Sequence, residues 1–262
     1  MRAGEAVETI QLDIYNHTVN LDTVIVTWLI IVASVIFLLI FKRYLGIIPG
    51  KLQTAVELAY EFFEEQADAM MGYEGREFVP IVFFIFITVL TFNWIGLLPS
   101  EVKAAGIPIF APPTKDINTT AALALCTFMV FNYYGFKKKG VGYFLNFIHP
   151  APEVAKSLPV FLIWVVIPLT VLFLILNIIE LFARVLSLSI RLFGNVLGEH
   201  IVSAALILFT TVVLEIFVAA GILAYLLPLF VFLLGIITGI VQAFIFAMLT
   251  MTYISGAVAH YE

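Results

Sequence analysis

The sequence predicts an all-α polytopic membrane protein, and its composition and long uncharged stretches support this. Of the 262 residues, 63% are hydrophobic and 12% are charged, whereas a soluble domain is about half apolar and about a quarter charged. A transmembrane barrel would need strands of about ten residues that alternate in polarity, and the sequence shows no such pattern. A net charge of −5 without a long basic stretch also argues against binding to nucleic acid.

The membrane-spanning helices are predicted from stretches without charge, since a spanning helix needs about 20 apolar residues. Four such stretches precede Glu180, and they are residues 23–41, 78–100, 117–136 and 157–179. A long apolar region with sparse charges then reaches Glu215, and residues 216–259 carry none. We expect about five to six hydrophobic helices, the last two long, with a break near 221–228 as one way to shorten the final stretch.

A single membrane domain over residues 1–262 is expected, with its sides set by basic residues. Residues 1–22 are polar and acidic and form an external N-terminus, and residues 23–41 are an uncleaved first span. Lys42, Arg43 and Lys51 follow the first span and Lys137 to Lys139 the third, so both clusters should be cytoplasmic. The other parts are a cytoplasmic segment at 42–77, the second and third spans with their loops at 78–156, and the final helices at 157–262.

Residues 52–70 form an amphipathic interfacial helix in this prediction. Apolar residues share one arc of about 80°, and they are Leu52, Val56, Ala59, Phe63, Ala67 and Met70. Acidic residues share the opposite side, and they are Glu57, Glu61, Glu64, Glu65 and Asp68. The helix can lie on the membrane surface or on a partner helix. Its acidic face favours a protein partner over anionic lipid, and an ordinary surface helix is the equal alternative.

Ionisable and polar residues inside apolar helices mark the candidate site, because charge is costly in a membrane. If residues 177–203 are one helix, six polar side chains fall within about 100° of each other. They are Asn177, Glu180, Arg184, Arg191, Asn195 and Glu199, and we call them the polar stripe. Gly194 and Gly198 lie beside this stripe with the spacing of a helix-contact motif. His200 points the other way, and Glu215 lies farther along.

Arg191 is the most informative residue of the polar stripe. Glu180 and Arg184 are four residues apart and can pair, whereas Arg191 has no acidic residue three or four positions away. An arginine at mid-membrane costs about 2.5–3.5 kcal/mol even on lenient scales. We therefore expect its partner in another chain, the alternative being lipid phosphate or backbone carbonyl groups.

The last helix presents a second polar face. Gln242 lies within about 60° of Gly235 and Gly239, which again have helix-contact spacing, and of Phe246 and Tyr253. This face is expected to meet the polar stripe around Arg191.

Other chemistry is poorly supported by the sequence. Residues 46–51 read G-I-I-P-G-K and are too short for a phosphate-binding loop, and no H-E-x-x-H metal motif occurs. The single cysteine, Cys126, excludes an internal disulfide and a cysteine metal cluster, and is expected to be a small core residue. We therefore expect no catalytic residues, no metal and no cofactor.

Residues 187–195 read S-L-S-I-R-L-F-G-N and resemble the signature of subunit a of the F-type ATP synthase. Three further stretches are similar to that family in the same order. They are N-W-I-G-L-L-P at 93–99, P-P-T-K-D-I-N-T-T-A-A-L-A-L at 112–125 and G-I-V-Q-A-F-I-F-A-M-L-T at 239–250. The resemblance covers most of the chain after about residue 75.

The resemblance implies an ion-translocating stator subunit, most simply for protons, that is not catalytic by itself. Arg191 would match the family's essential arginine, with Asn195 and Gln242 as its polar companions. Arg191 would separate two half-channels and interact with a carboxylate of the rotating c-ring, and residues 157–262 would be tilted ion-channel helices. The implied partners are the c-ring, the peripheral stalk b subunits, the rest of the complex and the lipid bilayer of a bacterial plasma membrane.

Some positions depart from the family pattern. Nine residues after Arg191 stands His200, preceded by Glu199, and seven residues before Gln242 stands Gly235. The outer half-channel therefore has three candidates, Glu199, His200 and Glu215. Asn177 takes the place of a usual acidic residue, with Glu180 one turn later.

The alternatives are a stand-alone secondary transporter in which Arg191 binds an anionic substrate, and a non-conducting assembly scaffold, but the internal repeat expected of a transporter is not found.

Overall fold

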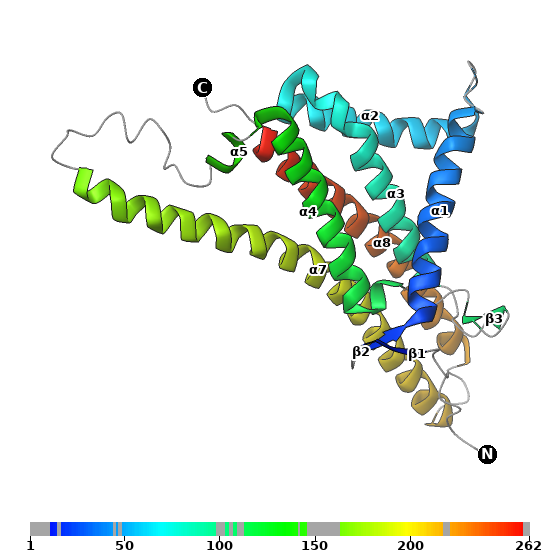
Figure 1. Cartoon of the computed structure of the whole chain (residues 1–262). Coiled ribbons are helices and arrows are strands. Elements are labelled where there is room, and N and C mark those ends of the chain that lie inside the picture. The colour runs from blue at the N-terminus through cyan, green and yellow to red at the C-terminus, as the bar shows by residue number, and fades with distance from the viewer. Residues whose placement is uncertain are drawn as a thin grey trace.

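Long helices make up the architecture of the protein in its computed structural model (Figure 1). The structure describes residues 11–14, 17–43, 46, 49–97, 103–104, 107–108, 113–140, 142–145, 163–216 and 221–258. Within these ranges the predicted all-α fold is confirmed, and the strands are limited to two short antiparallel hairpins. One hairpin joins β1 (Gln11–Ile14) to β2 (His17–Asn20), and the other joins β3 (Lys103–Ala104) to β4 (Ile107–Pro108).

The N-terminal half contributes three long helices. Helix α1 (Leu21–Arg43) covers the predicted first span, α2 (Lys51–Met71) the predicted amphipathic helix, and α3 (Val79–Gly96) the predicted second span. A 3-10 turn, η1 (Gly72–Phe78), joins α2 to α3. Gly72 ends α2 with φ of 66°, a left-handed conformation that glycine adopts without steric cost, and its N–H donates to the Asp68 carbonyl.

The third predicted span is α4 (Ile117–Lys139), which follows the 3-10 turn η2 (Pro113–Lys115). Asp116 caps α4, since its side chain accepts a hydrogen bond of 2.9 Å from the Asn118 backbone N–H. Gly140 ends α4 with φ of 59°, and the short helix α5 (Gly142–Leu145) follows. Cys126 is exposed on α4, so the prediction that it is a core residue was wrong, because the face that carries it points away from the bundle.

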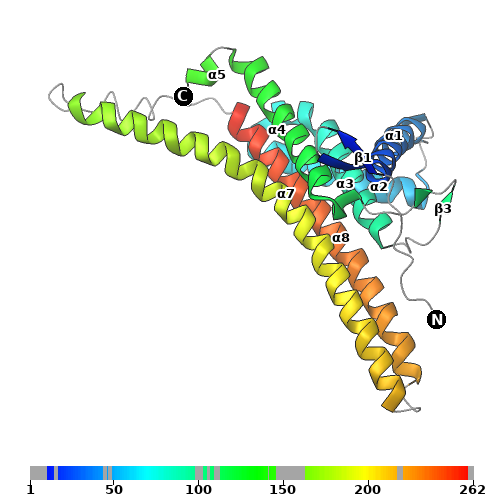
Figure 2. The same ribbon diagram turned by 60° about the horizontal axis from the view of Figure 1, so that its bottom comes forward.

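The C-terminal half folds into two long antiparallel helices, α7 (Ile163–Ile216) and α8 (Gly221–Val258), which lie side by side over part of their length. The beginning of α7, and the end of α7 with the beginning of α8, extend beyond the other helices (Figure 2). The predicted span 157–179 is not a separate helix, because the described part of it runs without interruption into the polar stripe. The uncharged stretch 216–259 does not form one helix either. Helix α7 ends at Ile216, and α8 begins at Gly221 and continues through Pro228, so the break expected near 221–228 does not occur there.

Four described stretches are long and apolar enough to cross a membrane, and they are Thr23–Arg43, Lys51–Gly96, Thr170–Leu206 and Leu229–Val258. Helix α4 has 23 residues and is long enough to cross, but it is not among these four. Its residues 117–120, Asn132 and three terminal lysines make it more polar than the others. Helix α4 packs against α7 and α8, so protein rather than lipid covers part of this polar surface.

The apolar arc of α2 packs on the chain itself, on α3 and α8. Phe63 is 1% exposed, and its ring centroid lies 5.2 Å from that of Phe86 and 6.3 Å from that of Phe244. Ala67 is fully buried, whereas Leu52 stays exposed. The core therefore sits where α2, η1, α3, α4 and α8 meet, and α7 contributes Leu188 and Leu192 to it.

Candidate functional site

The candidate site lies along the contact between α7 and α8. Because α7 is one continuous helix, all six residues of the polar stripe lie on it, as the assumption of a helix over 177–203 requires. Gln242 lies on α8 and is 6% exposed, and the two helices pack against each other. The stripe therefore divides along α7 into a part near Glu180, a centre at Arg191 and a part near Glu199.

Near Glu180, the charges are satisfied within the chain. Arg184 forms the predicted ion pair with Glu180, one helical turn away. The same guanidinium group lies 4.9 Å from the ring centroid of Tyr253 on α8, a cation–π contact. Asn177 lies one turn earlier and is half-buried. This part of the site lies toward the end of the bundle where Ser255 of α8 donates to the Met70 carbonyl at 3.4 Å.

Arg191 is half-buried and forms no ion pair or hydrogen bond with any residue that the structure describes. Its neighbours Leu188 and Leu192 are 1% and 0% exposed, whereas Ile190 is 51% exposed. Arg191 thus stands at the border between the packed side of α7 and its open side. Glu180 and Glu199 lie about 16 Å and about 12 Å away along the helix axis at 1.5 Å per residue.

Gly194 and Gly198 lie on the open side of α7. Both are exposed, and a Cβ atom placed on either would meet no other atom within 4 Å. This glycine motif is therefore not used in the packing of the described chain. Leu197 and Ile201 are also exposed beside it, at 40% and 60%. The surface next to Arg191 is apolar and unobstructed, and another helix can approach it closely.

Gly235 and Gly239 are instead buried in contacts within the chain. A Cβ atom on Gly235 would overlap the carboxylate of Glu199 and the side chain of Leu97 at the end of α3. A Cβ on Gly239 would lie 3.2 Å from Trp94 and 3.3 Å from Asn93 on α3. The expected contact of this face with the polar stripe is thus found at Gly235, while Gly239 serves the packing of α3.

Buried polar atoms gather around these glycines. The Asn93 amide donates to the Gly239 carbonyl at 3.3 Å, and Trp94 donates to the Ile236 carbonyl at 3.4 Å. Five buried side-chain atoms have no hydrogen-bond partner among the described residues; one belongs to Thr114, and the other four belong to Asn93, Asn195, Glu199 and Gln242. An unsatisfied buried polar atom costs about 1–3 kcal/mol. These atoms make this part of the helix contact hydrophilic.

The other two candidates for this part of the site lie elsewhere. His200 is half-buried and lies about 100° from Glu199 around the axis of α7, so the two side chains leave different sides of the helix. Glu215 belongs to the last turn of α7, and its side chain lies outside the described part of the structure. The Glu199 carboxylate, in contrast, lies against Gly235 of α8.

Sequence reasoning missed three polar residues that the fold brings to this site. Asn93 was quoted only within a motif, although it is the one amide in the apolar stretch 78–100. Thr120 and Ser189 hydrogen-bond across the contact of α4 with α7 at 3.3 Å. An isolated polar side chain in an apolar stretch is the signal that could have identified Asn93. No group of three or more metal-binding side chains is found within the described ranges.

The regions that match known proteins include all residues of this site. The family model described as "ATP synthase A chain" matches residues 24–255. A protein of Moorella thermoacetica named "ATP synthase subunit a" is 35% identical over 240 residues, 90% of each chain. Proteins of the same name from Gloeobacter violaceus and from the chloroplast of Stigeoclonium helveticum are each 34% identical. These matches cover 94% of this chain and 87% and 88% of those relatives.

Proposed function

The chain belongs to the ATP synthase A chain family, and from this premise we propose that it is the ion-conducting stator subunit of an F-type ATP synthase. It carries protons between two half-channels beside a rotating ring of c subunits and is not catalytic by itself. The observation that carries this proposal is the half-buried Arg191, which has no acidic partner among the described residues and borders an open glycine-lined surface.

Arg191 receives its counter-charge from the ring in this proposal. A carboxylate about 4 Å from the guanidinium group gains about 4 kcal/mol at an effective dielectric constant of about 20. Gly194 and Gly198 permit that approach, since no atom of the described chain lies over them. The arginine then favours the ionised ring carboxylate, and its own positive charge repels protons that would otherwise leak along α7.

Two half-channels on either side of Arg191 fit the distribution of polar groups. Glu199, Asn195 and Gln242, with Asn93 of α3, form the outer half-channel in this proposal, because their buried polar atoms gather at the end of α3. Glu180 and Asn177, near Arg184, form the inner one. Glu199 is preferred to His200 for the outer route because its carboxylate lies against Gly235 on α8, whereas His200 lies about 100° away around α7. No role is assigned to Glu215.

The partners and location follow from the same premise. We expect contacts with the c-ring, with the peripheral stalk b subunits and with the rest of the complex, in the plasma membrane of a bacterium. The N-terminus lies outside and the loop that follows Lys137 to Lys139 lies in the cytoplasm. The fold supports these sides, because α2 and the end of α4 lie together at one end and both β hairpins lie toward the other (Figure 1).

The test is proton pumping by inverted membrane vesicles that carry Arg191→Ala, with assembly checked by co-purification of the ring and stalk subunits. We expect a complex that assembles but neither acidifies the vesicles on ATP addition nor makes ATP. Arg43→Ala, at the exposed end of α1, is the matched control and should pump normally. Pumping by Arg191→Ala at the wild-type level would refute the proposal and leave a scaffold without conduction.

A further inference from the structure

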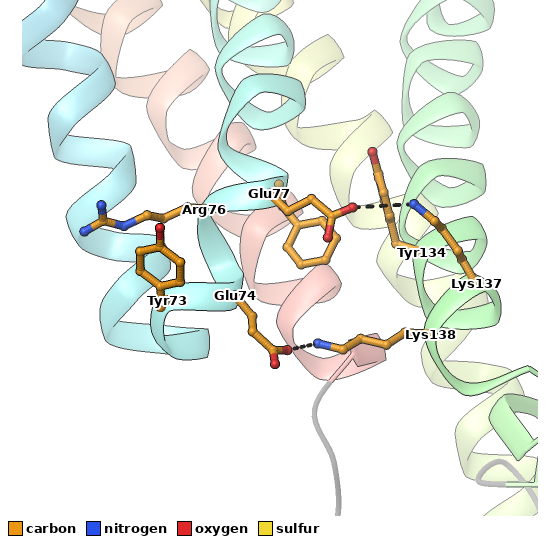
Figure 3. A pocket seen from close by; sticks show the side chains of 8 residues that line it. Tyr73, Glu74, Arg76, Glu77, Tyr134, Lys137 and Lys138 are labelled. Atoms are coloured by element: carbon orange, nitrogen blue, oxygen red, sulfur yellow. Dashed lines mark hydrogen bonds and ion pairs between the residues drawn. The ribbon is translucent and has the colours of Figure 1, made fainter.

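A pocket of about 630 Å³ lies between η1 and the last turn of α4, away from the translocation site (Figure 3). Its charged lining consists of Glu74, Arg76 and Glu77 from η1 and Lys137 and Lys138 from α4. Tyrosine side chains from both elements complete the walls. The pocket is therefore neither a basic patch nor an apolar groove but a site with both signs of charge and aromatic walls.

The charges of this pocket are balanced. Lys137 lies 3.4 Å from Glu77, and Lys138 is paired with Glu74 (Figure 3). Arg76 is held separately by two oxygens of Asp68 on α2, at 2.9 and 3.1 Å from its Nε. Two lysines and two glutamates remain, and the glutamate side chains are 73% and 65% exposed. Exposed pairs of this kind contribute only about 0–1 kcal/mol, so a ligand can engage all four groups.

The pocket lies where two apolar segments end. Helix α3 begins at Val79, directly after Glu77 and Phe78, and the uncharged stretch of α4 ends at Phe136, directly before Lys137. Charged groups at that boundary lie at the level of lipid headgroups, where tyrosine is also enriched. Tyr73 is 81% exposed there, and Tyr134 carries Lys137 over its ring at 5.9 Å.

Helix α4 offers an apolar track that leads away from this pocket. Leu125, Met129, Tyr133 and Phe136 lie within about 80° of one another at 100° per residue, and their exposed fractions are 46%, 66%, 62% and 49%. Lys137 adjoins the same side. The track is about 16 Å long at 1.5 Å per residue, close to half of a hydrocarbon core of about 30 Å. It therefore matches the acyl chains of one leaflet.

We propose that this pocket binds the headgroup of a zwitterionic phospholipid with a primary amine, the phosphoethanolamine type, whose acyl chains lie along α4. Lys137 and Lys138 bind the phosphate, and Glu74 and Glu77 accept hydrogen bonds from the ammonium group. A quaternary choline headgroup has no N–H to donate. A phosphoglycerol headgroup carries the negative phosphate but no positive amine. Because the two lysines and two glutamates of the pocket cancel in charge, the pocket gives this headgroup no net electrostatic attraction.

The intact complex is tested after reconstitution into vesicles that contain a trace of phospholipid with a photoreactive acyl chain. The headgroup is phosphoethanolamine, phosphocholine or phosphoglycerol, and the readout is the cross-linking yield on the peptide that contains residues 117–139. We expect the phosphoethanolamine probe to label at least about fivefold more than the other two, as expected for two added charge-assisted hydrogen bonds. Equal labelling, or strongest labelling by the glycerol probe, would overturn the proposal.

Variants then assign the headgroup contacts. Glu74→Gln with Glu77→Gln keeps the side-chain shapes and should abolish the preference for the amine probe over choline. Lys137→Ala with Lys138→Ala should reduce labelling by all three probes. Lys42→Ala with Arg43→Ala removes two cations from the end of α1 and is the matched control, with unchanged labelling. A preference that persists in the glutamine variant would show that the carboxylates do not bind the amine, against the proposal.

Discussion

Gly235 leaves the space in α8 that the Glu199 carboxylate occupies, so a single methyl group should disturb the outer side of the site. We predict that Gly235→Ala destabilises the protein by about 1–3 kcal/mol through overpacking and lowers proton pumping severalfold. Gly256→Ala in the same helix is the matched control, since its Cβ would meet nothing within 4 Å. That control should be neutral or stabilising by up to about 1 kcal/mol. Thermal unfolding and vesicle acidification measure the two effects.

The double variant Gly235→Ala with Glu199→Ala separates packing from conduction. It should recover only part of the lost stability, because the shortened residue 199 no longer meets the new methyl group whereas Leu97 still does, and it should not recover pumping. Full pumping by the double variant would exclude Glu199 from the outer half-channel.

Asp68 ties the end of α2 to η1 and should make stability depend on pH. The hydrogen bonds from Arg76 lower the pKa of Asp68 below its usual 3.8, and burial opposes this only in part. Because the folded-state pKa is the lower one, this stabilisation is complete well above pH 3.8 and is lost as the pH falls through the folded-state value. Asp68→Asn should therefore lower the melting temperature at pH 7, and the gap to wild type should close below pH 3.8.

The Arg76→Gln variant removes the partner of Asp68 and should show the same closing gap. A constant difference in melting temperature between pH 7 and the acid limit would mean that the ion pair does not supply the stability.

Contacts between single residues could be predicted from the sequence where both residues lie within a few positions of each other on the same helix. Glu180 and Arg184 could be paired from their spacing alone, because helix geometry places them together. The stacking of Arg184 on Tyr253 and the placement of Glu199 against Gly235 join residues far apart in the chain. No spacing rule reaches such pairs, because they depend on the lateral position and rotation of α8 against α7.

Among the elements, α2 is the one whose role the structure defines most clearly. Its apolar arc packs on α3 and α8 instead of on lipid, with Phe63 at the centre and 1% exposed. We predict that Phe63→Ala costs about 3–5 kcal/mol, the usual price of truncating a buried phenylalanine. Leu58→Ala on the same helix, where the side chain is 67% exposed, should stay within about 0.5 kcal/mol. Thermal unfolding of the purified protein distinguishes the two, and equal costs would mean that α2 does not pack as described.

Helix boundaries were predicted well where a charged residue and a glycine both occur near the helix end. They were predicted poorly where a charged residue was the only signal. Helices α1 to α4 begin and end near the charged residues that bound the predicted segments. Glu180 did not end a helix, since its carboxylate pairs with Arg184 along the same helix and no glycine or proline interrupts residues 177–190. The charge of Glu180 therefore marks a position inside a helix and not a helix end.

At the scale of the whole molecule, the two ends of the bundle should face opposite sides of the membrane. We predict that, in a Cys126→Ala background, Lys115→Cys reacts with a membrane-impermeant maleimide in right-side-out vesicles. Lys139→Cys should react only in inverted vesicles. The reason is that η2 and the end of α4 lie at opposite ends of one 23-residue helix. Labelling of both positions from the same side would refute the proposed topology.

The length of α7 has a mechanical consequence. Its 54 residues measure about 81 Å, far more than a hydrocarbon core of about 30 Å, so in the proposed arrangement α7 lies strongly tilted and extends along the plane of the membrane. A stator has to resist the torque of a turning rotor. For a given torque, the force at each anchoring contact falls as the lever arm grows. An outstretched α7 allows small individual contacts to hold the subunit still while the rotor turns past it.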